Sequence, residues 1–205
     1  SNAALNGHLD CLKYARENGC GWDELTCSNA ALNGHLNCLK YARENGCEWD
    51  ESTCNYSAQN GHLDCLKYAR EIGCPWDEKT CYCAAKNGHL NCLQYACENG
   101  CRVCRYVYGV AASGGHLNCL KYLHDNPYIK KNKFGWDLVA GYAAENGHLN
   151  CLKYAIENGC PWYEWTCSSA AAYGHLDCLK YAHKNGCPYD ILECLRSAKN
   201  RETKE

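Results

Sequence analysis

The chain has 205 residues, of which 46% are apolar and 21% charged, a composition that excludes an intrinsically disordered protein. The formal net charge of −2 argues against nucleic acid or an anionic membrane as a partner. No stretch of about 18 apolar residues occurs and no signal peptide is visible, so the sequence predicts neither a membrane span nor secretion.

The predicted elements recur as a repeat marked by the triplet Gly-His-Leu. Its glycines are Gly7, Gly34, Gly61, Gly88, Gly115, Gly147 and Gly174. Successive triplets are 27 residues apart, except between Gly115 and Gly147, where the step is 32. The first of the seven units is truncated, as if the N-terminus were cut. We therefore predict a single repeat array over residues 1–205.

Each unit predicts two helices, as residues 49–74 illustrate. The first helix follows Asp50, a good N-cap because its carboxylate accepts hydrogen bonds from backbone N–H groups, and ends at residues 60–61. The second covers about residues 62–71, with apolar side chains at three-residue spacing, and Gly73 ends it. Helices of about three turns are marginal alone, so their faces must be buried by stacking, as in a solenoid.

Cysteine supplies 21 of the residues, mostly in three columns locked to the repeat. The first column is Cys11, Cys38, Cys65, Cys92, Cys119, Cys151 and Cys178; the second is Cys20, Cys47, Cys74, Cys101, Cys160 and Cys187; the third is Cys27, Cys54, Cys81, Cys167 and Cys194. Equivalent residues of stacked helices lie about 10 Å apart, beyond the ~7 Å reach of a disulfide. We expect buried, reduced thiols and an intracellular, cytoplasmic protein.

Metal binding and catalysis are the rival interpretations of these cysteines and of the repeated histidine. The best metal candidates are Cys97, Cys101 and Cys104, but a closed zinc site needs four ligands and a single CxxC is a weak signal. The histidine occurs in every triplet, which is typical of a residue that holds a turn, and we expect it to bond a nearby backbone group. We expect no cofactor and no enzyme activity, and keep a zinc-binding or redox-sensing array as the alternative.

The string from Thr26 through Ala30-Ala31, the segments 33–36 and 38–41, and the closing 44–47 resembles the ankyrin repeat. Most units here have 27 residues where ankyrin repeats have 33. The resemblance implies an all-α, ankyrin-like α-solenoid of stacked helix-turn-helix repeats, with short turns in place of full β-fingers. Short Cys- and Trp-rich arrays of this kind resemble those of large DNA viruses and protists, which would place a viral protein in the host-cell cytoplasm.

The resemblance also implies a partner protein that contacts the turns and first helices, where residues vary between repeats. The candidate partner-binding residues are Tyr56, Lys79, Tyr82, Arg102, Arg105, Tyr106, Lys130, Lys131, Lys133, Tyr142 and Trp165. Aromatic side chains are favoured anchors in interfaces. The alternative is that some of them fill gaps between imperfect repeats.

Two irregular segments are basic. Residues 101–108 gain Arg102 and Arg105, and an insertion at about 127–135 carries three lysines within a turn. We expect these cations on one edge of neighbouring repeats, facing an acidic patch on the partner, unless the insertion is only a tolerated, solvated loop. Residues of about 188–205 are predicted to form a C-terminal capping half-repeat.

The predicted function is thus a monomeric, non-catalytic scaffold for protein–protein interaction. A second alternative is the substrate-recruiting arm of a ubiquitin-ligase adaptor.

Overall fold

The computed structural model describes residues 2–23, 25–130, 135–188, 190, 194 and 196. Within these ranges the chain forms helices and turns and no β-strand, which confirms the predicted all-α class and the short turns in place of β-fingers. The residues group into two compact units, 1–104 and 105–205, and we describe each by itself. The single array over the whole chain therefore stays a prediction, and most of the predicted cap at 188–205 lies outside the described residues.

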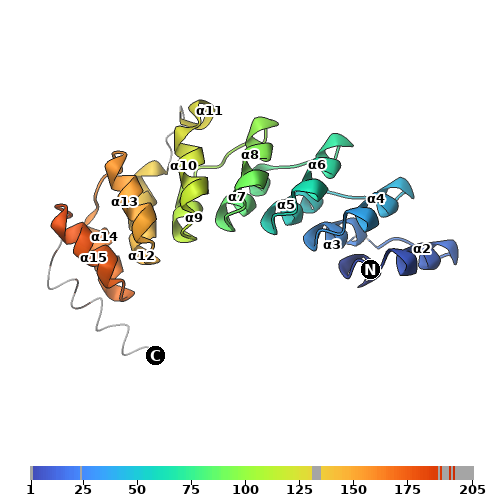
Figure 1. Ribbon diagram of the computed structural model, residues 1–205, viewed down its shortest axis with the longest axis horizontal. Helices are drawn as coiled ribbons and strands as arrows, with labels where there is room; N and C mark the ends of the chain where they lie inside the picture. Colours follow the sequence, from blue (N-terminus) through green and yellow to red (C-terminus); the bar gives the residue numbers. More distant parts are fainter. Residues whose placement is uncertain are drawn as a thin grey trace. The chain divides into compact units, whose positions relative to one another are not determined.

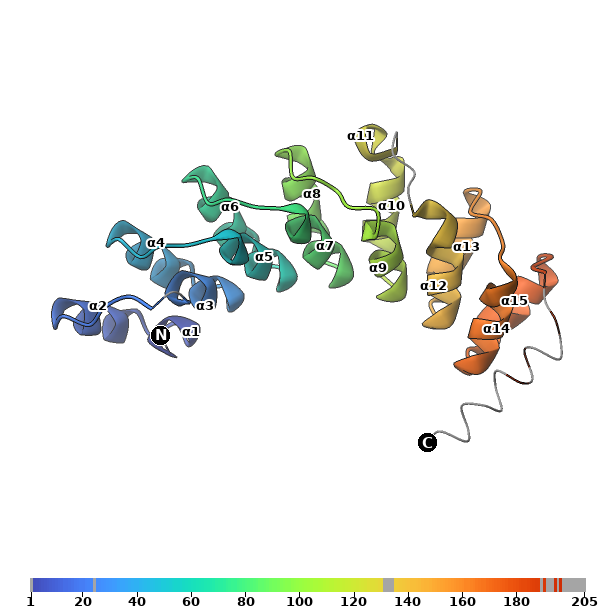
Figure 2. The ribbon, with the colours of Figure 1, turned by 180° about the vertical axis from the view of Figure 1, so that it is seen from behind.

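In the first unit, each repeat pairs a first helix with a second helix. The first helices are α1 (Asn2–Leu5), α3 (Thr26–Leu32), α5 (Glu51–Gln59) and α7 (Glu78–Lys86). The second helices are α2 (Leu9–Glu17), α4 (Leu36–Glu44), α6 (Leu63–Glu71) and α8 (Leu90–Glu98). The first helices stand side by side in one row and the second helices form another (Figure 1). Figure 2 shows the extended connections that lead from α4 to α5 and from α6 to α7.

The second unit repeats this pattern around the insertion. Its first helices are α9 (Val107–Ser113), α12 (Val139–Glu145) and α14 (Glu164–Ala172), and its second helices are α10 (Leu117–Asp125), α13 (Leu149–Glu157) and α15 (Leu176–Lys184). The insertion was expected to be a turn, but its start forms the short helix α11 (Pro127–Lys130), and η1 (Trp136–Leu138) follows its end. Proline suits a first helical position because its missing N–H needs no partner there, and Ile129 is buried.

Local signals set the helix bounds. The Asp50 carboxylate accepts a hydrogen bond from the Ser52 backbone N–H at 3.0 Å, and Asp77 accepts one from Lys79 at 2.9 Å, so both act as the predicted N-caps. Helix α6 ends at Glu71, and Gly73 two residues later has a φ of +86°, a left-handed conformation that favours glycine.

The core of each repeat consists of small and aliphatic side chains. In the first unit, Leu39, Leu66 and Leu93 are fully buried, and the first-column thiols beside them are nearly so. This packing confirms the prediction that the columnar cysteines act as small apolar residues, apart from the exposed Cys11 and Cys20 and the partly exposed Cys194.

An aromatic ladder joins each repeat of the first unit to the next. Trp49 meets the edge of Tyr68 with ring centroids 6.4 Å apart, and the Arg43 guanidinium lies 4.7 Å from the Trp49 ring. Earlier in the chain, the indole N–H of Trp22 donates to the carbonyl oxygen of Asn45 at 2.8 Å. The tryptophans therefore hold each turn against the following repeat.

The histidine of the triplet also reaches a neighbouring repeat. In the second unit, His148 Nε2 lies 2.9 Å from the carbonyl oxygen of Ser113, which belongs to the preceding repeat. Its ring packs against Gly115, where an added Cβ would come within 2.5 Å of Nδ1. The predicted backbone contact is confirmed there, and it joins two repeats rather than holding one turn.

Candidate protein-binding surface

In the first unit, the exposed side of the first helices carries large side chains. Tyr56 on α5 and Lys79 at the start of α7 are exposed, and Tyr82 is partly exposed. Sequence analysis did not select Leu25, whose side chain is 59% exposed just before α3. The sequence could have indicated it, because Leu25 is the repeat equivalent of the candidate Lys79. We call Leu25, Tyr56, Lys79 and Tyr82 the first-helix surface.

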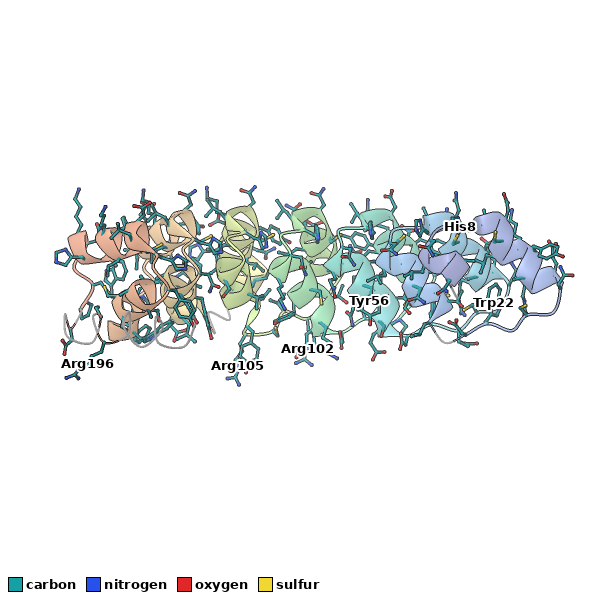
Figure 3. All side chains as sticks on the ribbon, turned by 90° about the horizontal axis from the view of Figure 1, so that it is seen from below. His8, Trp22, Tyr56, Arg102, Arg105 and Arg196 are labelled. Atoms are coloured by element: carbon teal, nitrogen blue, oxygen red, sulfur yellow. The ribbon has the colours of Figure 1, made fainter. Side chains whose placement is uncertain are left out.

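A buried hydrogen bond between α5 and α7 supports the first-helix surface on its inner side. On α5 the residues next to Tyr56 are buried, and Asn55 Oδ1 accepts a hydrogen bond of 2.7 Å from the hydroxyl of Thr80 on α7. This bond ties two neighbouring first helices together. Since both partners are buried, the bond fixes the spacing of α5 and α7 at the point where Tyr56 projects (Figure 3).

Arg102 is exposed at the end of the first unit, in the turn after α8 (Figure 3). Arg105 is exposed too but belongs to the second unit, so the expected common edge of the two arginines stays a prediction.

In the second unit, Arg105 and Tyr106 form an exposed pair. The guanidinium lies 5.2 Å from the tyrosine ring centroid, and Tyr106 is 58% exposed. A Cβ on Gly135 would come within 2.2 Å of the Arg105 carbonyl oxygen, so the insertion ends against this pair. We call Arg105, Tyr106 and Gly135 the Arg105 edge.

The insertion carries the three lysines that were predicted to contact the partner. Lys131 and Lys133 lie outside the described residues, and Lys130 is known only as the last residue of α11. Their place in a partner site therefore stays a prediction.

Tyr142 and Trp165 fill space between repeats of the second unit. A Cβ on Gly109 would lie 2.9 Å from the Tyr142 ring, and one on Gly141 would lie 1.8 Å from the Trp165 ring. The two rings meet edge to face with centroids 6.1 Å apart and remain partly exposed. Both side chains thus have the packing role considered as the alternative, beside any contact with a partner.

The thiols contact one another across columns, which the sequence comparison within columns did not anticipate. In the first unit, Cys74 Sγ donates to the carbonyl oxygen of Asp50, and Cys101 Sγ donates to that of Asp77 at 3.1 Å. The second-column thiols thereby reach the start of the first helix, beside the third-column thiol of the same repeat. The Cys54 thiol contacts that of Cys74, and this contact together with burial raises its pKa well above the ordinary value.

The three metal candidates named from the sequence are Cys97, Cys101 and Cys104. Two of them, Cys97 and Cys101, each contact a fourth thiol, that of Cys81, with Cys97 Sγ 3.7 Å from Cys81 Sγ. No group of three or more His, Cys, Asp or Glu side chains that could hold a metal ion was found in the described ranges. In the same ranges no helix combines the length and the hydropathy needed to span a bilayer.

Comparisons with known proteins agree with this architecture. The family model "Ankyrin repeats (3 copies)" matches residues 27–107 and again 108–192. The ankyrin repeat domain of human ASB11 has a similar fold, with a TM-score of 0.62 and 18% identity over 78% of this chain and 83% of that domain. No curated protein sequence matches the chain.

Proposed function

Because the chain belongs to the ankyrin repeat family, we propose that it is a non-catalytic scaffold that binds another protein through its turns and first helices. Ankyrin repeats generally mediate protein–protein interaction. The observation that carries the proposal for this chain is a contrast between positions. The recurring leucine, cysteine and alanine positions, such as Leu39, Cys38 and Ala42, are buried, whereas the exposed positions of the first helices differ from repeat to repeat.

The first-helix surface has the side chains that anchor interfaces. Tyr56 has Asn29 and Cys83 as its repeat equivalents, and Lys79 has Leu25 and Ser52, so none of these exposed residues is needed for stacking. A tyrosine supplies a large, rigid contact area with one polar group, and such residues dominate binding energies in many interfaces.

The cations of both units favour an acidic feature on the partner. In the Arg105 edge, stacking on Tyr106 holds the guanidinium in an exposed position before any partner arrives. A pre-positioned guanidinium loses less side-chain entropy on binding and forms bidentate hydrogen bonds with a carboxylate. We propose that the partner presents carboxylates to Arg105 and to Arg102, and that the scaffold acts as a monomer in an intracellular compartment, consistent with its free thiols.

Replacing exposed residues by their repeat equivalents tests the proposal without disturbing the fold. The test variant is Tyr56→Asn, Lys79→Ser and Tyr82→Ser, which installs residues native to the same positions of other repeats. The control is Ile72→Asn, because Ile72 is an exposed apolar residue at a helix end where the other second helices have asparagine.

The assay captures partners from a lysate with the unaltered chain, identifies them by mass spectrometry and measures their affinity for each variant. We expect the triple variant to weaken binding at least about tenfold, equivalent to the loss of ~1.4 kcal/mol, and Ile72→Asn to bind as the unaltered chain does. Equal binding by the triple variant would exclude the first-helix surface. An Arg105→Glu variant then tests the Arg105 edge in the same way.

A further inference from the structure

Cys97 occupies a position at which the earlier repeats have arginine. Its equivalents in the first unit are Arg16, Arg43 and Arg70, each stacked on a tryptophan. In the fourth repeat both partners change, because Val103 stands where the tryptophan would be. Cys97 therefore has no part in the aromatic ladder and is one of the few cysteines outside the three columns.

The position faces the third-column thiol of its own repeat. The Arg43 charge acts on the Cys27 thiol, and Arg70 acts in the same way on Cys54. In the fourth repeat the arrangement brings two thiols together, and Cys97 Sγ lies 3.7 Å from Cys81 Sγ. The two residues sit on α7 and α8, which pack against each other.

We propose that Cys81 and Cys97 are a site of oxidative modification, at which a peroxide converts the two thiols into a disulfide that links α7 to α8. The sulfur atoms have to approach from 3.7 Å to the S–S bond length of about 2.0 Å.

The two thiols have different parts in the reaction. Cys97 is partly exposed and meets the oxidant first, whereas Cys81 is fully buried. Hydrogen bonds with Cys101 and Cys97, together with burial, raise the pKa of Cys81, and its complete burial keeps a dissolved oxidant away from it. Cys81 is then the resolving thiol.

The chemistry needs one peroxide and releases two waters. Cys97 sulfur attacks a peroxide oxygen, an S–O bond forms as the O–O bond breaks, and the hydroxide leaves as water with the Cys97 proton. Cys81 sulfur then attacks the sulfenic sulfur. An S–S bond forms, the S–OH bond breaks, and the hydroxide takes the Cys81 proton and leaves as the second water. The two thiols together lose two electrons to the peroxide.

Peptide mapping of the full chain after treatment with hydrogen peroxide tests the site. Free thiols are blocked with iodoacetamide, and trypsin, which cleaves after Lys79, Lys86 and Arg102, places Cys81 and Cys97 on peptides 80–86 and 87–102. We expect a linked pair of these peptides that disappears on reduction.

Variants identify which cysteines form the link. Cys97→Arg installs the residue of the earlier repeats and should abolish the link, as should Cys97→Ser, while Cys83→Ser should leave it intact. The third repeat is an internal control. Arg70 there stands in the place of Cys97, and the Cys54–Cys74 contact, which is the equivalent of Cys81–Cys101, should stay unlinked.

Three results would overturn the proposal. One is a link that persists in both Cys97 variants, which would join Cys81 to another thiol. Another is Cys97 trapped as sulfenic or sulfinic acid while Cys81 remains free. The third is linkage of Cys54 to Cys74 as fast as that of Cys81. Circular dichroism of each variant shows whether the helices are retained, and the Cys97→Ser variant keeps the test valid if arginine disturbs the fold.

Discussion

Replacing Gly141 with alanine tests whether the Trp165 ring is packed against α12. A Cβ on Gly141 would lie 1.8 Å from the nearest ring carbon and 2.3 Å from two others. Carbon atoms in contact stay about 3.5–4.0 Å apart, so the ring has to retreat by about 2 Å. At Gly109 the nearest atoms of Tyr142 are 2.9 Å away, so the same substitution there displaces the ring far less.

In Gly141→Ala, the higher helix propensity of alanine and the clash with the Trp165 ring change the free energy of unfolding in opposite directions. Alanine within a helix is ~1 kcal/mol more favourable than glycine. Overpacking costs ~1–3 kcal/mol, and disturbing the edge contact of Trp165 with Tyr142 costs a further ~0.5–1.5 kcal/mol. Gly141→Ala should therefore lower the free energy of unfolding by ~2 kcal/mol. For Gly109→Ala the helical gain and the smaller clash nearly cancel, and we expect a change within ~0.5 kcal/mol of zero.

Urea unfolding, followed by circular dichroism, measures both variants. The double variant Gly141→Ala with Trp165→Leu removes the clashing ring, and leucine is native at the equivalent Leu25. We expect this pair to be clearly non-additive, with Gly141→Ala costing less when the ring is absent. If Gly141→Ala stabilised the protein, or if its effect were independent of residue 165, the reasoning about this contact would be wrong.

Three further predictions concern the joints between repeats and the buried thiols. His148→Ala should lower the free energy of unfolding by ~1–3 kcal/mol, because the Ser113 carbonyl loses its partner, whereas the exposed His8 should tolerate alanine in the same urea titration. Asp50→Ala should cost ~1 kcal/mol by thermal melting and Asp50→Asn little, unless the N-cap contributes nothing. The free energy of unfolding should fall as pH rises from 9 to 11. In the folded protein the buried first-column thiols have a pKa of about 11, whereas in the unfolded chain they ionise near 9, so ionisation favours the unfolded chain over this interval. Melting temperatures that stay constant over this interval would contradict it. The thiols concerned are Cys65, Cys92, Cys119, Cys151 and Cys178.

The helices were predictable because their signals are local. Asp50 and Gly73 mark the limits of their elements through hydrogen bonds and backbone conformation within a few residues, and such signals are visible in one sequence. The repeat then supplied the stacking, since seven copies of one pattern leave few other ways to bury the apolar faces.

Contacts between columns were harder to predict because they depend on how helices face one another. Comparing equivalent cysteines along a column gave the correct expectation of separate, buried thiols but missed the approach of Cys81 to Cys97, which lie on different helices.

The joints between repeats in the first unit have a consequence for how such a chain can change. Trp49 meets Tyr68 in the same way as Trp76 meets Tyr95, with nearly equal distances. If residues 50–76 were deleted, Trp49 would stand in the place of Trp76 and find an identical neighbour. Loss or duplication of the DNA that encodes one repeat would therefore yield a chain that still stacks in the same way. It would also bring new pairs of exposed side chains next to each other. Recombination within the gene can in this way produce new recognition surfaces without remaking a buried one.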